Sequence, residues 1–373
     1  MKKIIGLLVA LSSFVVMVHA EDIVVSWSSN GVVMAEGIEP GSICSFEWAS
    51  TLDSTFTNAA IVFDDMIADA NGEIQLGVPM YFRVSATPPD PTPEGMVSIP
   101  GGTNSGTNPL GDGESYDSYY PQTYSLTVDS FDMDATEVTN DEMVRVMQWA
   151  YDNGKLLASS NSVKNAQGDQ QELLDLDSSD CRITWSGGTF GIKSTKGSGY
   201  PCVEVTWYGA VAYCNYRSEM DLRTPCYNLS DWSCNFSANG YRLPTSDEWE
   251  YAARGGLSSK RFPWGDTITH NQANYDSSLS YSYDVSSTRG FHPDYDDGGY
   301  PYTSPVGSFS SNGYGLYDMS GNLWEWCNTS FGSNRGIRGA GWDSDANGLR
   351  CGHEVWFSPN DPNARVGFRS VCR

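Results

Sequence analysis

A proline-rich stretch, TPPDPTPEG at residues 87–95, divides the chain and limits how it can fold. Four prolines in nine residues hold the backbone extended and leave little to pack, which is typical of a linker. Before it, segments such as DIVVSW and VPMYFRVSA are rich in β-branched and aromatic residues, a pattern that predicts short strands. We therefore expect a small β-sandwich-like module at residues 21–86 and a larger domain at residues 96–373.

Residues 1–20 have the pattern of a secretory signal peptide. Lys2 and Lys3 precede an apolar run from Ile4 to Val18, and Ala20 supplies a small residue at the expected cleavage point. The run is too short for a membrane anchor, and no later stretch has the length of a spanning helix. The sequence thus predicts an exported protein, secreted or periplasmic, that does not reside in a membrane.

The chain is strongly acidic. It has 46 Asp and Glu residues against 22 Lys and Arg residues, a formal net charge of −24. Such a surface repels phosphate backbones, so nucleic acid is a poor partner. The charge suits divalent cations, and it is equally compatible with solubility alone.

All nine cysteines follow the predicted signal peptide. Disulfides persist in the oxidising compartments that exported proteins reach, and an odd number leaves at least one cysteine unpaired. Cys226 and Cys234 flank a loop that a disulfide between them would staple, and Cys181 and Cys202 flank a predicted hairpin. Cys44, in the first module, is the cysteine left over.

Three helices are expected in the larger domain. In VTNDEMVRVMQWAYDNG, a capping box of Thr139 and Glu142 precedes apolar residues at helical spacing, and the pattern ends near Gly154. Thr245 and Glu248 repeat this capping box in RLPTSDEWEYAARGG. Between them, VTWYGAVAYCNYRSEM is typical of a buried helix.

Eight stretches of the larger domain occur in one order: MVSIPGG, ATEVTN, VEVTWYGAVAYC, GYRLPTSDEWEYAARGG, FPWGD, NGYGLYDMSGNLWEWC, RGAGW and VGFR. This series closely resembles the formylglycine-generating enzyme, or sulfatase-modifying factor, family over nearly all of residues 96–373. The resemblance implies an α+β class: an irregular C-type-lectin-like fold with few helices and short strands, braced by structural calcium, after the small all-β module.

The resemblance implies one calcium site in LYDMSGNLWEW. The family pattern assigns it to the side chains of Asp318 and Glu325 and to the carbonyls of Gly321 and Leu323. Calcium takes six to eight oxygen ligands and accepts such a mixed set. The alternative is an Asx turn with solvated carboxylates.

A second calcium site is implied by the same resemblance. Asn274 and the carbonyl of Tyr275 match one half of it. Asp297 with the carbonyl of Gly299 or Tyr300 matches the other half, with one extra residue that shifts the register. Asx turns are again the alternative.

Active members of the family oxidise a substrate cysteine with oxygen and a copper ion held by two cysteines, since soft thiolates suit copper(I). Here Ser344 stands where the first thiol is expected, and the segment from Trp342 to Arg350 is about three residues too short for the second. Gly341 and Arg365 replace a serine and an asparagine of the family pattern. The sequence therefore does not favour copper.

Cys351, in RCGHE, is a weak alternative catalytic residue because His353 lies two residues away. Its register matches a structural half-cystine of the family, for which Cys327 is the nearest candidate partner. Cys214 and Cys372 match another family disulfide. We therefore expect a structural role for Cys351 and keep a reactive thiol as the alternative.

Aromatic residues are the candidates for ligand recognition. They are expected either to ring the cleft where the family binds its peptide or to fill the core: Trp342, Trp356, Phe357, Tyr295, Tyr300 and Tyr302. Aromatic faces beside Asp and Asn also suit sugar rings. The histidines His270, His292 and His353 show no metal-ligand spacing.

Two functions from different classes remain open on the sequence. The first is a calcium-braced binding or accessory module that lacks the copper thiols and recognises a peptide, a sulfatase or a glycan outside the cytoplasm. The second is a formylglycine-generating oxidase that converts a sulfatase active-site cysteine. The missing cysteine pair favours the first.

Overall fold

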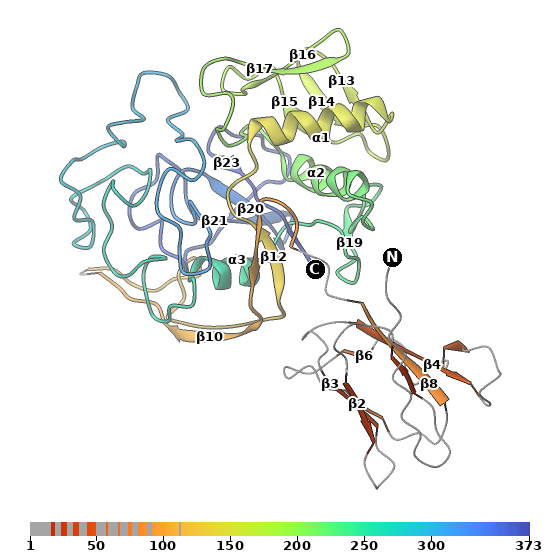
Figure 1. The fold of residues 1–373 in the computed structure, drawn as a ribbon. Helices are drawn as coiled ribbons and strands as arrows, with labels where there is room; N and C mark the ends of the chain where they lie inside the picture. The colour runs from red at the N-terminus through yellow and green to blue at the C-terminus, as the bar shows by residue number, and fades with distance from the viewer. Residues whose placement is uncertain are drawn as a thin grey trace. The chain divides into compact units, whose positions relative to one another are not determined.

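The computed structural model describes residues 92–111 and 113–373 in full, together with the backbone of eight short strands before residue 88 (Figure 1). The chain divides into two compact units, Met1–Pro91 and Thr92–Arg373. The described strands of the first unit lie in two sheets, of order β1-β8-β4-β5 with β6 on β4, and β2-β3-β7. Their bounds are Val16–Val18 (β1), Val24–Trp27 (β2), Val33–Glu36 (β3), Ile43–Ala49 (β4), Thr57–Asn58 (β5), Met66–Ile67 (β6), Ile74–Leu76 (β7) and Tyr81–Thr87 (β8).

The first unit is thus all-β in its described part, as the sequence predicted. Strand β1 falls within the segment expected to be a signal peptide and pairs in parallel with β8. Export stays a prediction. The leftover cysteine, Cys44, lies on β4, and its side chain lies outside the described residues.

The second unit has three helices and many short strands in its described residues. The helices are Asn140–Asp152 (α1), Trp207–Met220 (α2) and Ser246–Ala253 (α3). The strands are Met96–Ile99 (β9), Gly102–Thr107 (β10), Thr123–Val128 (β11), Phe131–Asp134 (β12), Leu156–Ala158 (β13), Ser162–Asn165 (β14), Glu172–Asp175 (β15), Ile183–Ser186 (β16), Thr189–Ile192 (β17), Tyr227–Asn228 (β18), Ser233–Cys234 (β19), Trp324–Phe331 (β20), Asn334–Arg338 (β21), Val355–Phe357 (β22), Val366–Gly367 (β23) and Val371–Cys372 (β24).

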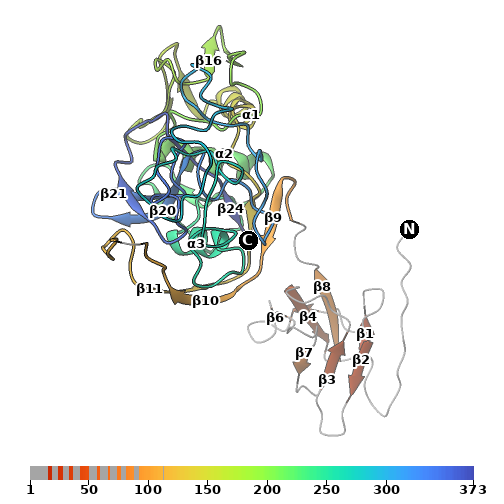
Figure 2. The same ribbon diagram turned by 90° about the vertical axis from the view of Figure 1, so that its left-hand side faces the viewer.

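The helices begin where the sequence predicted. Thr139 caps α1 and Thr245 caps α3, each in a capping box with the glutamate three residues later. Thr206 caps α2, which is buried on nearly every side and lies beside α1 (Figure 1). The two helices form the main core with the strands around them, whereas α3 packs on β11 in a second core (Figure 2).

The sheets of this unit are small. The largest has the order β22-β21-β20-β23, and another, β24-β12-β9, joins the two ends of the unit. Residues 254–323, between α3 and β20, contain no helix or strand and form the loops at the left of Figure 1. This stretch has few ladder hydrogen bonds, so its shape depends on side-chain contacts and buried charges. None of the helices in the described residues is long and apolar enough to cross a membrane.

Candidate functional site

The predicted first calcium site lies in a tight turn ahead of β20. Asp318, Gly321 and Asn322 all have positive φ angles, of 56°, 92° and 68°. A Cβ on Gly321 would lie 2.5 Å from the carbonyl oxygen of Asn274, so only glycine allows this close approach. The turn is therefore pressed against Asn274, a residue predicted for the second site.

Asp318 is buried in this turn. One carboxylate oxygen, Oδ2, accepts a hydrogen bond from the backbone N–H of Gly307 at 2.6 Å. The other, Oδ1, is buried without a hydrogen-bond partner. Burial raises the pKa of Asp318 to about 6.

Glu137 reaches the same place from the link between β12 and α1. Its Oε1 accepts a hydrogen bond of 3.0 Å from the side chain of Asn322, and its Oε2 is buried without a partner. Burial, and then the charge of Asp318, raises the pKa of Glu137 well above the usual range. Glu137 lies in the ATEVTN motif, but no functional role was predicted for it, because nothing local in the sequence indicates where its carboxylate points.

Glu325, the other predicted carboxylate ligand, already has strong partners. Arg369 donates from Nη2 to Oε1 and from Nε to Oε2, both at 2.7 Å, and Trp249 donates from its indole N–H at 2.8 Å. Arg369 also lies within electrostatic range of Glu137 and Asp318. Three buried carboxyl groups thus share one guanidinium, so the cluster carries an excess of negative charge whenever all three are ionised.

This arrangement suits a cation, with a ligand set that differs from the predicted one. The free carboxylate oxygens belong to Asp318 and Glu137, whereas both oxygens of Glu325 are engaged. Orphaned buried carboxylate oxygens are costly unless a proton or a cation satisfies them. No group of three or more His, Cys, Asp or Glu side chains in the described residues is arranged to hold a metal, so an ion here needs carbonyl ligands such as those of Gly321 and Leu323.

The predicted second calcium site contains a lysine. Lys196 Nζ lies 2.9 Å from Asp297 Oδ1, and it donates to the carbonyl oxygens of Gly299 at 2.7 Å and Pro301 at 3.0 Å. The Lys196 side chain is only 4% exposed. Its ammonium group therefore lies among the oxygens that were predicted to bind calcium, and these residues fit a second ion poorly.

The other residues predicted for the second site also have partners. Asn274 donates from Nδ2 to the carbonyl of Tyr302 at 2.8 Å, and its buried Oδ1 has no partner. The carbonyl of Tyr275 is 3.1 Å from His270 Nε2, and the carbonyl of Tyr300 accepts from Arg182. Asn274 is thus in contact with the first site through the turn at Gly321 rather than with Asp297.

The position expected for the copper thiols is a polar turn. Ser344 Oγ accepts a hydrogen bond from the backbone N–H of Gly341 at 3.2 Å. Arg365 forms an ion pair with Asp343, with Nε 2.5 Å from Oδ2. Hard oxygen and guanidinium groups occupy this position, which makes it unsuited to copper(I).

The aromatic residues predicted to ring one cleft divide into four groups. Trp342 packs edge-on against Tyr300 and Tyr302, with ring centroids 5.0 and 5.2 Å apart. Tyr295 instead packs on His292 and Phe309. Trp356 stacks on Phe331, and Phe357 lies on Trp326. Tyr300 is 39% exposed and Trp342 is 2% exposed, so Tyr300 is the accessible part of the first group.

Cys351 has a core environment. It is 1% exposed and packs in the second core with Trp249 and Cys327. Burial raises its pKa to about 12, which keeps the sulfur protonated and unreactive. The neighbouring His353 is mostly buried, and burial followed by the charges of Arg350 and Arg338 lowers its pKa to about 4. This pair lacks the open, cation-stabilised thiolate that a catalytic cysteine needs.

The expected disulfides are absent from the described residues. The cysteines there are all free thiols, and each is buried except for the half-buried Cys234: Cys181, Cys202, Cys214, Cys226, Cys234, Cys327, Cys351 and Cys372. The structure therefore does not support the pairings Cys181–Cys202, Cys226–Cys234, Cys214–Cys372 and Cys327–Cys351. The Cys372 sulfur instead lies 3.8 Å from the sulfur of Met96.

The fold and the ordered motifs define a family. Residues 81–373 match the sulfatase-modifying factor enzyme 1-like domain, and the chain belongs to this family. CarF, a solved structure, covers 75% of this chain and 98% of its own, with 23% identity and a TM-score of 0.50, which supports the fold alone.

Relatives within the family differ in activity. The formylglycine-generating enzyme of Thermomonospora curvata is 37% identical over 139 residues, which are 37% of this chain and 36% of that protein. The inactive Cα-formylglycine-generating enzyme 2 of Bos taurus is 32% identical over 182 residues, 46% of this chain and 49% of that protein. The serine/threonine-protein kinase Pkn1 of Chlamydia caviae is 29% identical over 266 residues, 66% of this chain and 33% of that protein. The chain thus spans between a third and a half of the length of these relatives.

Proposed function

We propose that this chain is an exported binding or accessory module on the sulfatase-modifying factor scaffold, and that it does not generate formylglycine through copper. The observation that carries the proposal is the turn at Gly341 and Ser344. Ser344 holds the turn by a hydrogen bond where the first copper thiol is expected, and the nearby Arg365 is neutralised by Asp343. The inactive relative in Bos taurus is a precedent for a family member without the activity.

The ligand of such a module is a peptide, a sulfatase or a glycan outside the cytoplasm. The group of Trp342, Tyr300 and Tyr302 supports this assignment, because Tyr300 offers an accessible ring within electrostatic range of the ion pair of Arg365 and Asp343. Aromatic rings next to charged and polar groups bind both peptide side chains and sugars.

Calcium would act as a structural brace in this proposal. Asp318 and Glu137 would hold the ion, together with the carbonyls of Gly321 and Leu323. The ion would neutralise the excess charge beside Arg369 and fix the turn ahead of β20. No second ion is proposed, because Lys196 supplies a positive charge there.

The alternative function, formylglycine generation, has the support of the relative in Thermomonospora curvata. A direct assay separates the two. The protein is loaded with copper(I) and incubated in air, with a thiol reductant to supply the remaining two electrons, together with a peptide carrying a sulfatase-type cysteine motif, and mass spectrometry follows conversion of the cysteine to the aldehyde. The Thermomonospora curvata enzyme is the positive control. We expect no conversion and no stoichiometric copper binding, and turnover of the peptide would overturn the proposal.

A further inference from the structure

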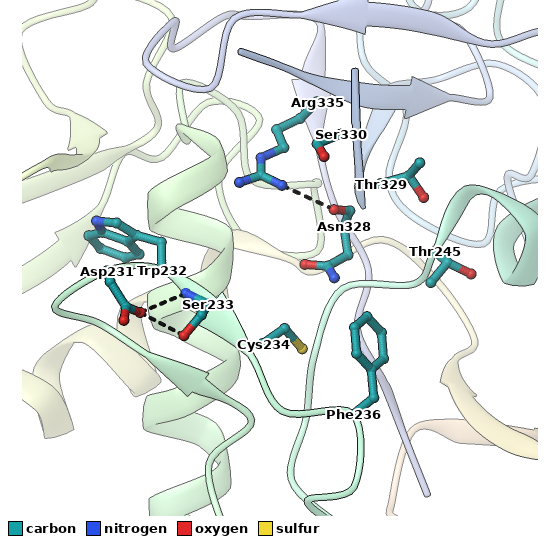
Figure 3. A pocket seen from close by; sticks show the side chains of 10 residues that line it. All are labelled: Asp231, Trp232, Ser233, Cys234, Phe236, Thr245, Asn328, Thr329, Ser330 and Arg335. Atoms are coloured by element: carbon teal, nitrogen blue, oxygen red, sulfur yellow. Dashed lines mark hydrogen bonds between the residues drawn. The ribbon is translucent and has the colours of Figure 1, made fainter. Parts of the chain in front are cut away.

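A solvent-open pocket lies between the β18–β19 hairpin and the far end of the β20–β21 hairpin (Figure 3). Its volume is about 450 Å³, within the range of small-ligand sites. Two aromatic and several hydroxyl or amide side chains line it, together with one acid, one thiol and one arginine: Asp231, Trp232, Ser233, Cys234, Phe236, Thr245, Asn328, Thr329, Ser330 and Arg335. The sequence of this region predicted only a loop stapled by Cys226 and Cys234.

Arg335 gives the pocket a fixed positive charge. Its guanidinium carbon lies 3.8 Å from the centroid of the Trp207 ring, and its Nη1 donates to the carbonyl of Asn328 at 3.2 Å. The β20–β21 ladder is irregular between Trp326 and Ser330, which frees the Asn328 carbonyl for this bond. The arginine is thus held in place before any ligand binds.

No carboxylate in the described residues neutralises Arg335. Arg335 forms no ion pair with any described residue. Burial lowers its pKa, and the nearby ionisable groups that oppose this change are the tyrosines Tyr208 and Tyr227. The desolvated guanidinium therefore keeps unused N–H donors in a protein with a net charge of −24. A fork of this kind matches a carboxylate.

The remaining lining suits a hydroxylated ring. Phe236 is 45% exposed and offers an accessible aromatic surface. Trp232 contributes its ring only, because its indole N–H already points to Asp169. Ser233, Thr329 and Ser330 add hydroxyl groups around the opening. Aromatic surface combined with several hydroxyl groups is the usual setting for sugar recognition.

We propose that this pocket binds an acidic sugar, a hexuronic acid residue of a glycan, with Arg335 as the carboxylate anchor and Phe236 as an aromatic wall. The proposal narrows the ligand of the proposed binding module and rests on that role. The two fail separately, because uronate binding and copper-dependent conversion of a cysteine peptide are measured in different assays.

The test compares a galacturonic acid oligomer with the neutral galactose oligomer of equal length, by calorimetric titration at fixed low calcium. We expect the wild type to bind the uronate oligomer more tightly than the neutral one. Arg335→Met, which keeps the aliphatic stem, should weaken uronate binding by roughly 10- to 100-fold, the value of a lost charge-assisted hydrogen bond. Its affinity for the neutral oligomer should not change.

Two further variants keep the test decisive. Arg145→Met removes the same charge from an exposed position on α1 and should bind like the wild type. Phe236→Ala removes a 45% exposed ring that also lies over the Arg242 guanidinium, and it should weaken the binding of both oligomers; its thermal melt shows whether the variant is folded. The proposal is overturned if the wild type binds no uronate oligomer, if both arginine variants lose binding equally, or if a peptide with a free C-terminal carboxylate binds more tightly than the sugar.

Discussion

Arg369 and Glu325 form a two-pronged ion pair in the interior of the second unit, with both nitrogen–oxygen distances at 2.7 Å and both side chains at 0% exposure. The pair connects the VGFR segment near the end of the sequence to β20 of the four-stranded sheet. Arg369 also donates to the carbonyls of Asp134, Ala135 and Tyr317. It therefore joins three segments that are far apart in the sequence.

Glu325→Gln should destabilise the protein by about 3–5 kcal/mol, because it leaves the Arg369 charge buried without a counterion. Glu219→Gln is the matched control. Glu219 pairs with Lys155 near the surface, and loss of an exposed pair costs about 1 kcal/mol or less. Urea unfolding measures the loss of unfolding free energy in each variant. Similar losses in the two variants would contradict the central role of the buried pair.

Calcium should stabilise the wild-type protein, and Asp318→Asn should remove most of that effect. In chelator, the variant should melt at or above the wild-type temperature, since it relieves the repulsion with Glu137. On addition of calcium, the melting temperature of the wild type should rise, because calcium binds to the folded state. Asp231→Asn changes the charge equally at an exposed site and should respond like the wild type. An unchanged wild-type melt in calcium would exclude the proposed brace.

Lys196→Met should loosen the segment at residues 295–302, because it removes the ammonium group from Asp297 and from the carbonyls of Gly299 and Pro301. Loss of a buried donor leaves acceptors unsatisfied, at a cost of about 1–3 kcal/mol. Amide hydrogen exchange should rise in this segment, whereas Lys164→Met, at an exposed position, should have no effect. In the wild type, chelator should not change exchange there. Faster exchange in chelator would show that a metal ion, and not Lys196, holds the segment.

His353→Gln should flatten the acid side of the stability profile. The pKa of His353 is lowered from 6.5 to about 4 on folding. Between these pH values the unfolded chain binds more protons than the folded chain. The part of the unfolding free energy that depends on a neutral His353 is therefore fully present above pH 6.5 and is lost as the pH falls toward 4. At pH 5 the loss is roughly 2 kcal/mol. Unfolding free energies at pH 5 and pH 7 should therefore lie closer together in the variant, and an equal difference would refute the neutral, buried state of His353.

Local features of the fold were predictable because their causes lie within a few residues. Thr139 with Glu142, and Thr245 with Glu248, satisfy the first N–H groups of their own helices, so the helix starts follow from the sequence. The order of the motifs likewise predicted the family, which the match over residues 81–373 confirms. The turn that contains Asp318 and Gly321 is local in the same sense.

Disulfide pairing could not be predicted from residues that are close together in the sequence. The expected bridges rested on flanking positions and on a family pattern, and sequence spacing does not fix which sulfurs meet. The folded chain buries Cys351 beside Trp249 and places Cys372 against Met96 instead. The reactivity of a thiol depends on the groups around it, and here these come from distant segments.

The sequence by itself determined the helix caps, the glycine turn, the acidic charge and the absence of two thiols around Ser344. Only the tertiary structure decided which charges meet. It brought Glu137 within electrostatic range of Asp318, placed Arg369 against Glu325, and placed the Lys196 ammonium among oxygens expected to hold calcium. The physical reason is that a cap or turn is stabilised by neighbours along the chain, whereas a buried charge is stabilised by a partner that long-range packing brings to it.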